Sequence, residues 1–219
     1  MKHLHAIIAS LAITPVHAQL SGTYTVGGAS PDYATITVAV NDLNAQGATG
    51  NVTFNIRPGT YTGQYDLGAI SGAPGFITFK SENNDASTVV LEFDASSSAD
   101  NFIFRIDGTD GVVLQALTLR PIDTFFARAV VFKNAIQILT ITDCVVEGSS
   151  DPNTAEGDQR ILLFCDQVLF GGPDNPQDVI IDGNHFHNGF DGIYLNFIGT
   201  SGARSQGLII TDNILEDQY

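Results

Sequence analysis

The stretch DVIIDGNHFHNGFDGIYL, residues 178–195, decides how this chain folds. Two short apolar runs, at 179–181 and 192–195, flank a segment rich in glycine, asparagine and aspartate. Between them, His185-Phe186-His187 alternates polar and apolar side chains. Short runs of this kind, interrupted by Gly, Asn and Asp, are typical of β-strands joined by turns.

The same unit recurs along the chain. VIIDGNHFH (179–187) is matched position for position by LIITDNILE (208–216), and LTITDCVVE (139–147) and VVLQALTLR (112–120) are further copies, with a weaker one at 77–82. The corner residues of the four clear copies are Leu117, Cys144, Asn184 and Asn213, spaced 27, 40 and 29 residues apart. Such a repeat indicates a solenoid, propeller or array. Without helical spacing between the copies, parallel β-coils are favoured.

A second strand precedes each copy, at 102–106, 129–132, 161–164 and 192–195. With these strands, and most clearly at 180–195, the pattern resembles the right-handed parallel β-helix of the pectin lyase-like superfamily, as in secreted bacterial proteins. The resemblance covers nearly all of the chain after residue 30. It implies an all-β solenoid in which the four corner residues stack and Asn184 and Asn213 begin an amide ladder, because adjacent coils lie about 4.8 Å apart.

Residues 1–18 have the features of a signal peptide. Lys2 is positively charged, and residues 4–13 form a short apolar stretch. Val16-His17-Ala18 resembles a small-residue cleavage site, with cleavage before Gln19. A buried N-terminal strand is the alternative, but the polar sequence that starts at Ser21 favours export. No stretch is apolar for long enough to span a bilayer. We therefore expect a protein that is secreted or at the cell surface and has no membrane span.

Residues 19–50 are predicted to form an N-terminal cap on a β-helix that covers 51–219. Ile36, Val40 and Leu43 share one face of a short capping helix, and residues 51–56 form the first clear strand. The phrase VTFNIRPGTYTGQ at 52–64 resembles the start of pectinesterase-like β-helices. Because no capping segment follows the strand at 208–215, we expect an incomplete solenoid that self-associates, and further domains in the parent protein beyond Tyr219.

The composition bounds the partners. Apolar residues make up 43% of the chain, and its formal net charge is −15. Nucleic acid is excluded because its phosphates require a basic face. An acidic surface permits divalent cations such as calcium, although solubility alone accounts for it. His185 and His187 share a strand face, but no third ligand is evident, so exposed strand histidines are favoured and no metal or cofactor is expected.

The two cysteines, Cys144 and Cys165, form either a disulfide or two buried thiols. They lie in different strands of the coil, and a disulfide requires close, correctly aimed Cβ atoms, so two thiols are favoured. Most phenylalanines are predicted to pack in the core or at corners (Phe102, Phe104, Phe125, Phe126 and Phe132). Tyr194 and Phe197, beside an insert, are the better candidates for an aromatic platform that contacts a glycan.

Residues 110–151 resemble pectinesterases beyond the bare repeat, through DGVVLQALTLRP, RAVVF and ITDCVVEGSSD. The resemblance implies two glutamines that form an oxyanion hole, an acid/base aspartate, and a nucleophilic aspartate one coil later. Here Arg128 and Ser150 stand at the glutamine positions, Asp151 is retained, and Asp166 is the nearest candidate nucleophile. Loss of one oxyanion-hole donor typically costs a factor of about 10²–10³ in rate. Asp151 and Asp166 are therefore weak catalytic candidates, and we expect no esterase activity.

Lyase chemistry would instead require calcium-binding acids and a base on one face of a groove. The chain offers acids at Asp107, Asp110, Asp143 and Asp182 but no base that the pattern places beside them. Two function classes remain open. The favoured one is an exported β-helix module with a structural or glycan-contacting role. The alternative is a polysaccharide-active enzyme, an esterase or lyase, whose missing active-site residues lie outside this chain.

Overall fold

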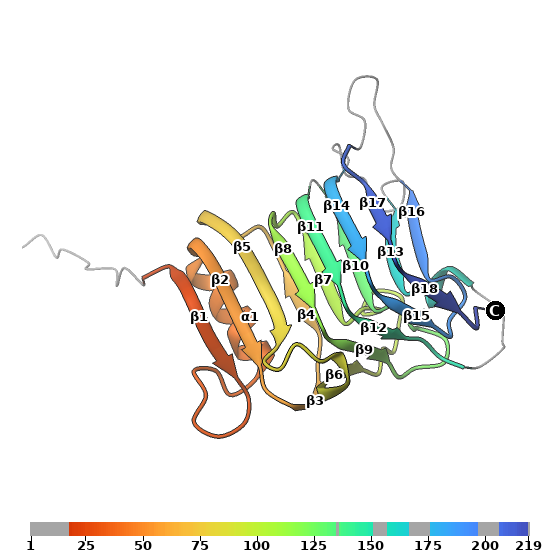
Figure 1. The fold of residues 1–219 in the computed structure, drawn as a ribbon, viewed down its shortest axis with the longest axis horizontal. Coiled ribbons are helices and arrows are strands. Elements are labelled where there is room, and N and C mark those ends of the chain that lie inside the picture. The colour runs from red at the N-terminus through yellow and green to blue at the C-terminus, as the bar shows by residue number, and fades with distance from the viewer. Residues whose placement is uncertain (1–17, 135, 151–156, 167–175, 197–205, 219) are drawn as a thin grey trace, which may run out of the picture.

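The protein folds as a right-handed parallel β-helix, as the sequence predicts (Figure 1). The computed structural model describes residues 18–134, 136–150, 157–166, 176–196 and 206–218. Three sheets, in each of which every strand pairs in parallel, form its sides. One face of every sheet packs into a shared core, which matches the short apolar runs of the repeat, rich in β-branched residues.

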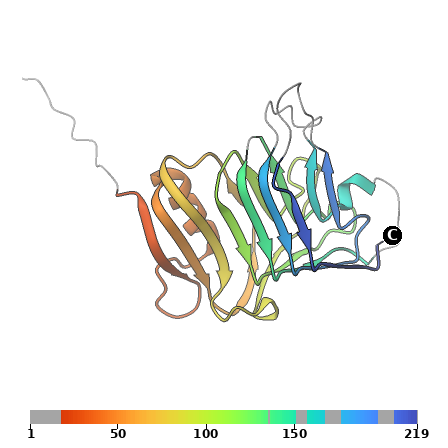
Figure 2. The same cartoon turned by 45° about the horizontal axis from the view of Figure 1, so that its top comes forward.

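We name the sheets A, B and C. Sheet A has the order β1 (Leu20–Val26), β2 (Ala48–Ile56), β5 (Gly72–Ser81), β8 (Val112–Gln115), β11 (Gln137–Thr142), β14 (Gln177–Asp182) and β17 (Ile209–Thr211). Sheet B has the order β18 (Ile214–Glu216), β15 (His185–His187), β12 (Val145–Glu147), β9 (Thr118–Pro121), β6 (Val89–Phe93) and β3 (Gly59–Thr62). Sheet C has the order β16 (Ile193–Asn196), β13 (Leu163–Asp166), β10 (Val130–Lys133), β7 (Phe104–Asp107) and β4 (Tyr65–Leu67). Figure 2 shows sheet A strand by strand along the solenoid axis.

The interior is filled by inward-facing residues that stack from coil to coil. Phe54 and Phe79 stack with ring centroids 4.8 Å apart, and Phe79 continues to Phe104 at 5.3 Å. Phe104 and Phe132 are fully buried, as predicted, whereas Phe125 and Phe126 are only half-buried. Aromatic stacking of this kind adds about 0.5–1.5 kcal/mol per pair beyond the area that is buried.

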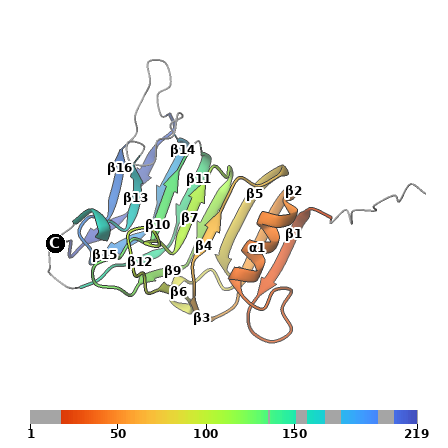
Figure 3. The ribbon, with the colours of Figure 1, turned by 180° about the vertical axis from the view of Figure 1, so that it is seen from behind.

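The first coil differs from the others because a helix replaces a strand of sheet C. Helix α1 (Ile36–Gln46) starts after Thr35, whose hydroxyl accepts a hydrogen bond from the Val38 amide, and it ends at Gly47. Its apolar face, including the predicted Ile36, Val40 and Leu43, is buried. Figure 3 shows α1 beside β4, where Asn44 donates a hydrogen bond to the Asp66 carbonyl. Sheet A also begins one strand earlier than the predicted strand at residues 51–56, because β1 precedes the helix.

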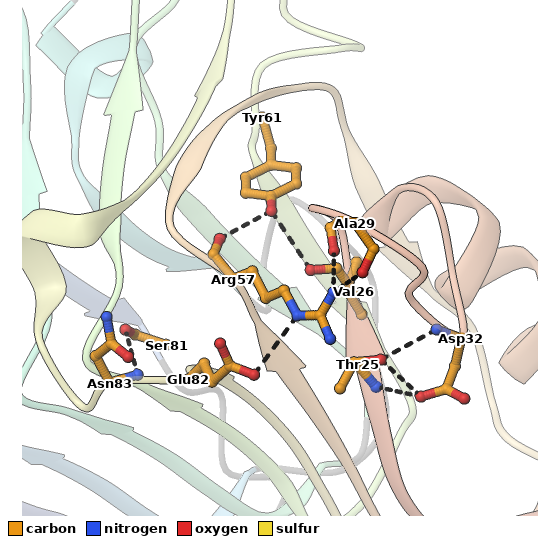
Figure 4. Close-up of polar contacts among 10 residues, drawn as sticks. Thr25, Val26, Ala29, Asp32, Arg57, Tyr61, Ser81, Glu82 and Asn83 are labelled. Carbon is orange, nitrogen blue, oxygen red and sulfur yellow. Dashed lines mark hydrogen bonds and ion pairs between the residues drawn. The ribbon is translucent and has the colours of Figure 1, made fainter.

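Polar contacts fasten the loop before α1 to the turn that follows β2. Arg57 donates to the carbonyl of Ala29 and lies 3.6 Å from Glu82, while the Tyr61 hydroxyl donates to the Arg57 carbonyl at 2.8 Å (Figure 4). Asp32 accepts hydrogen bonds from Thr25, and these lower the pKa of Asp32. The loop and the turn therefore form one polar cluster at the first coil.

The corner between sheets A and B repeats in four coils. In each, a residue in the left-handed region precedes the corner residue. These preceding residues are Ala116, Asp143, Gly183 and Asp212, with φ of 51°, 56°, 67° and 52°. The strand register places Leu117, Cys144, Asn184 and Asn213 at equivalent positions. A single left-handed residue bends the chain sharply, which is why Gly and Asp recur there.

Asparagine side chains link the coils at this corner. The Asn184 side-chain oxygen accepts a hydrogen bond from the Cys144 amide, and the Asn213 side-chain oxygen accepts one from the Asn184 amide, both at 2.9 Å. The Asn184 side-chain amide also donates to the Ile141 carbonyl at 2.8 Å. Asn184 is 1% exposed, so these bonds satisfy polar groups that water does not reach.

Cys144 and Cys165 are separate buried thiols, not a disulfide. Cys144 lies within the corner, and burial raises the pKa of its thiol to about 12. Among the described residues, no helix has the length and apolar character that crossing a membrane requires. The predicted signal peptide at 1–18 lies outside the described residues, except for its last position.

Candidate functional site

The outer face of sheet C carries the candidate site. Side chains alternate along its strands, so that one residue of each pair points into the core and the next points away. The register aligns Asp66, Arg105, Val131, Phe164 and Tyr194 in one outward row across the five strands. Tyr194, a predicted ligand-contacting residue, therefore shares this face with side chains from four earlier coils.

Aromatic and cationic groups stack at the later end of this row. The rings of Phe164 and Tyr194 are nearly parallel, with an interplanar angle of 14° and centroids 5.5 Å apart. The Arg128 guanidinium lies 3.8 Å from the Phe164 ring centroid. Phe164 is 2% exposed, whereas Tyr194 is partly exposed. Tyr194 thus offers a ring that is held in place from below, as a stacking platform requires.

Hydrogen bonds and ion pairs organise the earlier end of the row. Arg105 donates to Asp66 with its Nε atom at 2.8 Å, and its guanidinium lies 4.4 Å from the Phe102 ring centroid. Lys133 and Asp107 pair across the next outward-facing positions of β10 and β7, and the Lys133 Nζ atom lies 2.9 Å from Asp107 Oδ2. The hydrogen bond to Asp66 is the main reason why the pKa of the Arg105 guanidinium is raised.

A small cavity of about 50 Å³ lies between these groups and the loop that follows β6. Arg105, Arg128 and Lys133 line it, together with Asn101 and Phe102. Three of the nine basic residues of an acidic chain therefore surround one cavity. Its volume holds a water molecule or a small polar group, not a whole sugar ring.

The loop over this cavity is held by one carboxylate. Asp100 accepts hydrogen bonds from the hydroxyl and amide groups of Ser96 and Ser97, at 2.6–3.2 Å. These bonds, chiefly the one from the Ser97 hydroxyl, lower the pKa of Asp100 to about 2. Asn101 then bridges to the next coil, since its side-chain oxygen accepts a hydrogen bond from the Arg128 amide at 2.8 Å.

The structure describes three of the four residues at the esterase-like positions, namely Arg128, Ser150 and Asp166. Asp151 lies outside the described residues. Phe197, which is predicted to contact a glycan together with Tyr194, also lies outside them. Asp166 is the last residue of β13, where its backbone pairs with Asn196. Arg128 is only 4% exposed and packs on Phe164, while Ser150 is exposed. Arg128 therefore serves packing at the position where the resemblance places a glutamine.

The acids considered for a lyase lie apart. Asp107 pairs with Lys133 at the end of β7, whereas Asp143 and Asp182 lie at the corner between sheets A and B. His185 and His187 do share a face, with ring centroids 4.9 Å apart, and His185 lies 2.7 Å from Glu216. Within the described ranges, no three His, Cys, Asp or Glu side chains are grouped as metal ligands.

The sequence predicts a glycan contact at Tyr194 but gives no such role to the residues beside it. Arg105, Val131 and Phe164 belong to the same outward row, and Arg128 supports it. Aligning the sheet C strands of successive coils and comparing their outward-facing positions would group Arg105, Val131 and Phe164 with Tyr194. Arg128 precedes its strand, so that alignment gives no signal for it.

No family model and no curated protein matches this chain. Two crystal structures of the pectin methylesterase from Aspergillus niger are similar to it in fold. The penultimately deglycosylated form has a TM-score of 0.44 and 16% identity, over 78% of this chain and 58% of that one. The deglycosylated form has the same TM-score and 13% identity, over 91% of this chain and 88% of that one. The likeness is thus one of overall fold between distant chains.

Proposed function

We propose that this chain is an exported β-helix module, extracellular or at the cell surface, that contacts glycans through the outer face of sheet C. The observation that carries the proposal is the stack of Arg128, Phe164 and Tyr194 on that face. A ring that is fixed from below and partly exposed above can pack against the apolar face of a sugar. Arg105 and Lys133 are hydrogen-bond donors within reach of the same surface.

A non-catalytic role is supported by the chemistry of the esterase-like positions. A carbonyl oxygen that develops negative charge requires donors aimed at it in an accessible site. Arg128 is buried against Phe164, and Ser150 is too short to replace a glutamine amide. Export is supported by the signal-like features of residues 1–18, with residues 19–50 as the cap of the helix.

The direct test is glycan-array binding by the chain that begins at Gln19, compared with Tyr194→Ala and Tyr194→Phe variants. We expect Tyr194→Ala to weaken binding about fivefold, because one ring contact is worth on the order of 1 kcal/mol. Tyr194→Phe keeps the ring and should retain most of the affinity. Binding that is equal in all three proteins would contradict the assignment of this face.

The enzymatic alternative has its own assay. Methanol release from methyl-esterified polygalacturonate is measured for the wild type and for the double variant Asp151→Ala, Asp166→Ala. We expect neither protein to turn over substrate. Clear release by the wild type that disappears in the double variant would overturn the non-catalytic role.

A further inference from the structure

A second surface feature lies at the turn from sheet C into sheet A, at the edge where β8 and β11 begin (Figure 1). The strand register places Phe76, Gly111, Ile138, Asp178 and Gly207 at equivalent positions of successive coils. The last four adopt left-handed backbone conformations, with φ between 53° and 71°. The fold therefore requires the left-handed conformation in these coils.

Ile138 is the unusual member of this series. Its φ is 61°, a conformation that is a genuine outlier for a β-branched residue, whereas the neighbouring coils use Gly or Asp. The strain does not serve burial in the core, because the side chain is 38% exposed. Backbone strain of this kind concentrates at ligand-binding positions.

Ile138 and Phe76 form the two walls of a slot. Phe76 is 46% exposed, and Gly111 lies between the two walls in the register. A Cβ atom on Gly111 would lie 2.7 Å from the Gly75 carbonyl oxygen, so the floor must remain without a side chain. The resulting cavity has a volume of about 210 Å³. Two coil spacings separate the walls by about 10 Å, enough to admit one ring between them.

Polar residues fix both walls and form the rim. The Asn51 side-chain oxygen accepts a hydrogen bond from the Phe76 amide at 2.9 Å. The Asp110 side chain accepts one from the amide of Gln137, next to Ile138, at 2.7 Å. Within the part of the chain that the structure describes, the second Asp110 oxygen and the Asn51 side-chain amide group make no further hydrogen bond, so an acceptor and a donor remain for a ligand.

We propose that this Phe76–Ile138 slot binds one neutral pyranose ring of a glycan. The aromatic and aliphatic walls match the two C–H faces of a sugar, and Asp110 and Asn51 match its hydroxyl groups. The Asp110 carboxylate and the net charge of −15 disfavour uronate sugars. The site is separate from the outer face of sheet C, and the proposal does not depend on glycan binding by that face.

The test is saturation-transfer difference NMR on the full chain, with methyl glycosides of neutral hexoses as probes and the matching methyl uronosides for comparison. We expect the neutral glycosides to bind and the uronosides to bind at least fivefold more weakly. Phe76→Ala should lower the affinity at least fivefold, whereas the matched control Phe76→Tyr should keep it. Tyr194→Ala should leave the part of this signal that Phe76→Ala removes unchanged.

Two further variants separate a binding role from a structural one. Ile138→Asn removes a wall but suits the left-handed backbone, so it should weaken binding while the thermal midpoint stays equal or rises. Asp110→Asn keeps the acceptor for the Gln137 amide and removes the negative charge. It should therefore reduce the difference in affinity between the neutral glycosides and the uronosides. No binding by the wild type, binding unaffected by Phe76→Ala, or an Ile138→Asn variant that binds normally would each overturn the proposal.

Discussion

The corner between sheets A and B and the side of the molecule around sheet C are built by opposite rules. At the corner, each coil repeats one left-handed residue, and Asn184 and Asn213 join neighbouring coils. Around sheet C, the coils differ: a helix replaces the first strand, and loops lie over a cavity. At the turn from sheet C into sheet A, Ile138 stands among Gly and Asp. The regular corner carries stability, while the irregular side carries the features that suit a ligand.

The largest expected effect comes from removing the Asn184 hydrogen bonds that join neighbouring coils at the corner. Asn184→Ala would leave the buried Cys144 amide without its acceptor and the Ile141 carbonyl without its donor. We expect the free energy of unfolding to fall by about 3 kcal/mol, because each buried polar group left unsatisfied costs about 1–3 kcal/mol. Urea denaturation followed by circular dichroism measures it. Asn213→Ala, at a more exposed position, is the matched variant and should lower the free energy of unfolding by less. Equal decreases for the two variants would show that burial does not cause the destabilisation.

The left-handed positions of the corner allow a gain as well as a loss. Ala116 has φ of 51°, where a residue with a Cβ atom is strained. Ala116→Gly should therefore raise the free energy of unfolding by up to about 1 kcal/mol. Gly183→Ala is the reciprocal change and should lower it, since the new Cβ atom would also lie 3.1 Å from an Asp143 oxygen. A destabilised Ala116→Gly protein would mean that the corner tolerates Ala without strain.

Acid should affect the sheet C side through Asp100. Its pKa in the folded protein is about 2, below the value of about 3.9 expected for an unfolded chain. A lowered pKa contributes stability above pH 4, and this contribution is lost as the pH falls toward 2. Thermal midpoints measured from pH 5 to pH 2 should therefore fall less steeply in Asp100→Asn than in the wild type. Parallel curves for the two proteins would contradict the role of Asp100.

The smallest effect concerns the thiols. Burial raises the pKa of Cys144 to about 12, so the reactive thiolate is scarce at neutral pH, and Cys165 is also buried. Ellman's reagent should detect no thiol in the native protein and two per chain in denaturant. Rapid labelling of the native protein would show that the corner opens on its own.

The sequence by itself determined the coil. Local alternation of apolar residues, together with Gly, Asp and Asn at the turns, specifies short strands and left-handed bends, because both depend on nearby residues. The capping helix followed from Ile36, Val40 and Leu43 in the same way. The sequence also predicts Tyr194, beside an insert, as a candidate glycan contact, but it does not predict the residues that pack around it.

Only the tertiary structure decided which distant residues meet. Arg128 packs on Phe164 from a neighbouring coil, and Ile138 faces a slot whose other wall, Phe76, lies two coils away. Such contacts depend on the register between coils and on the lengths of the loops that join them. A local pattern does not contain this information, because a shift of one residue would turn every side chain of a strand to the opposite face.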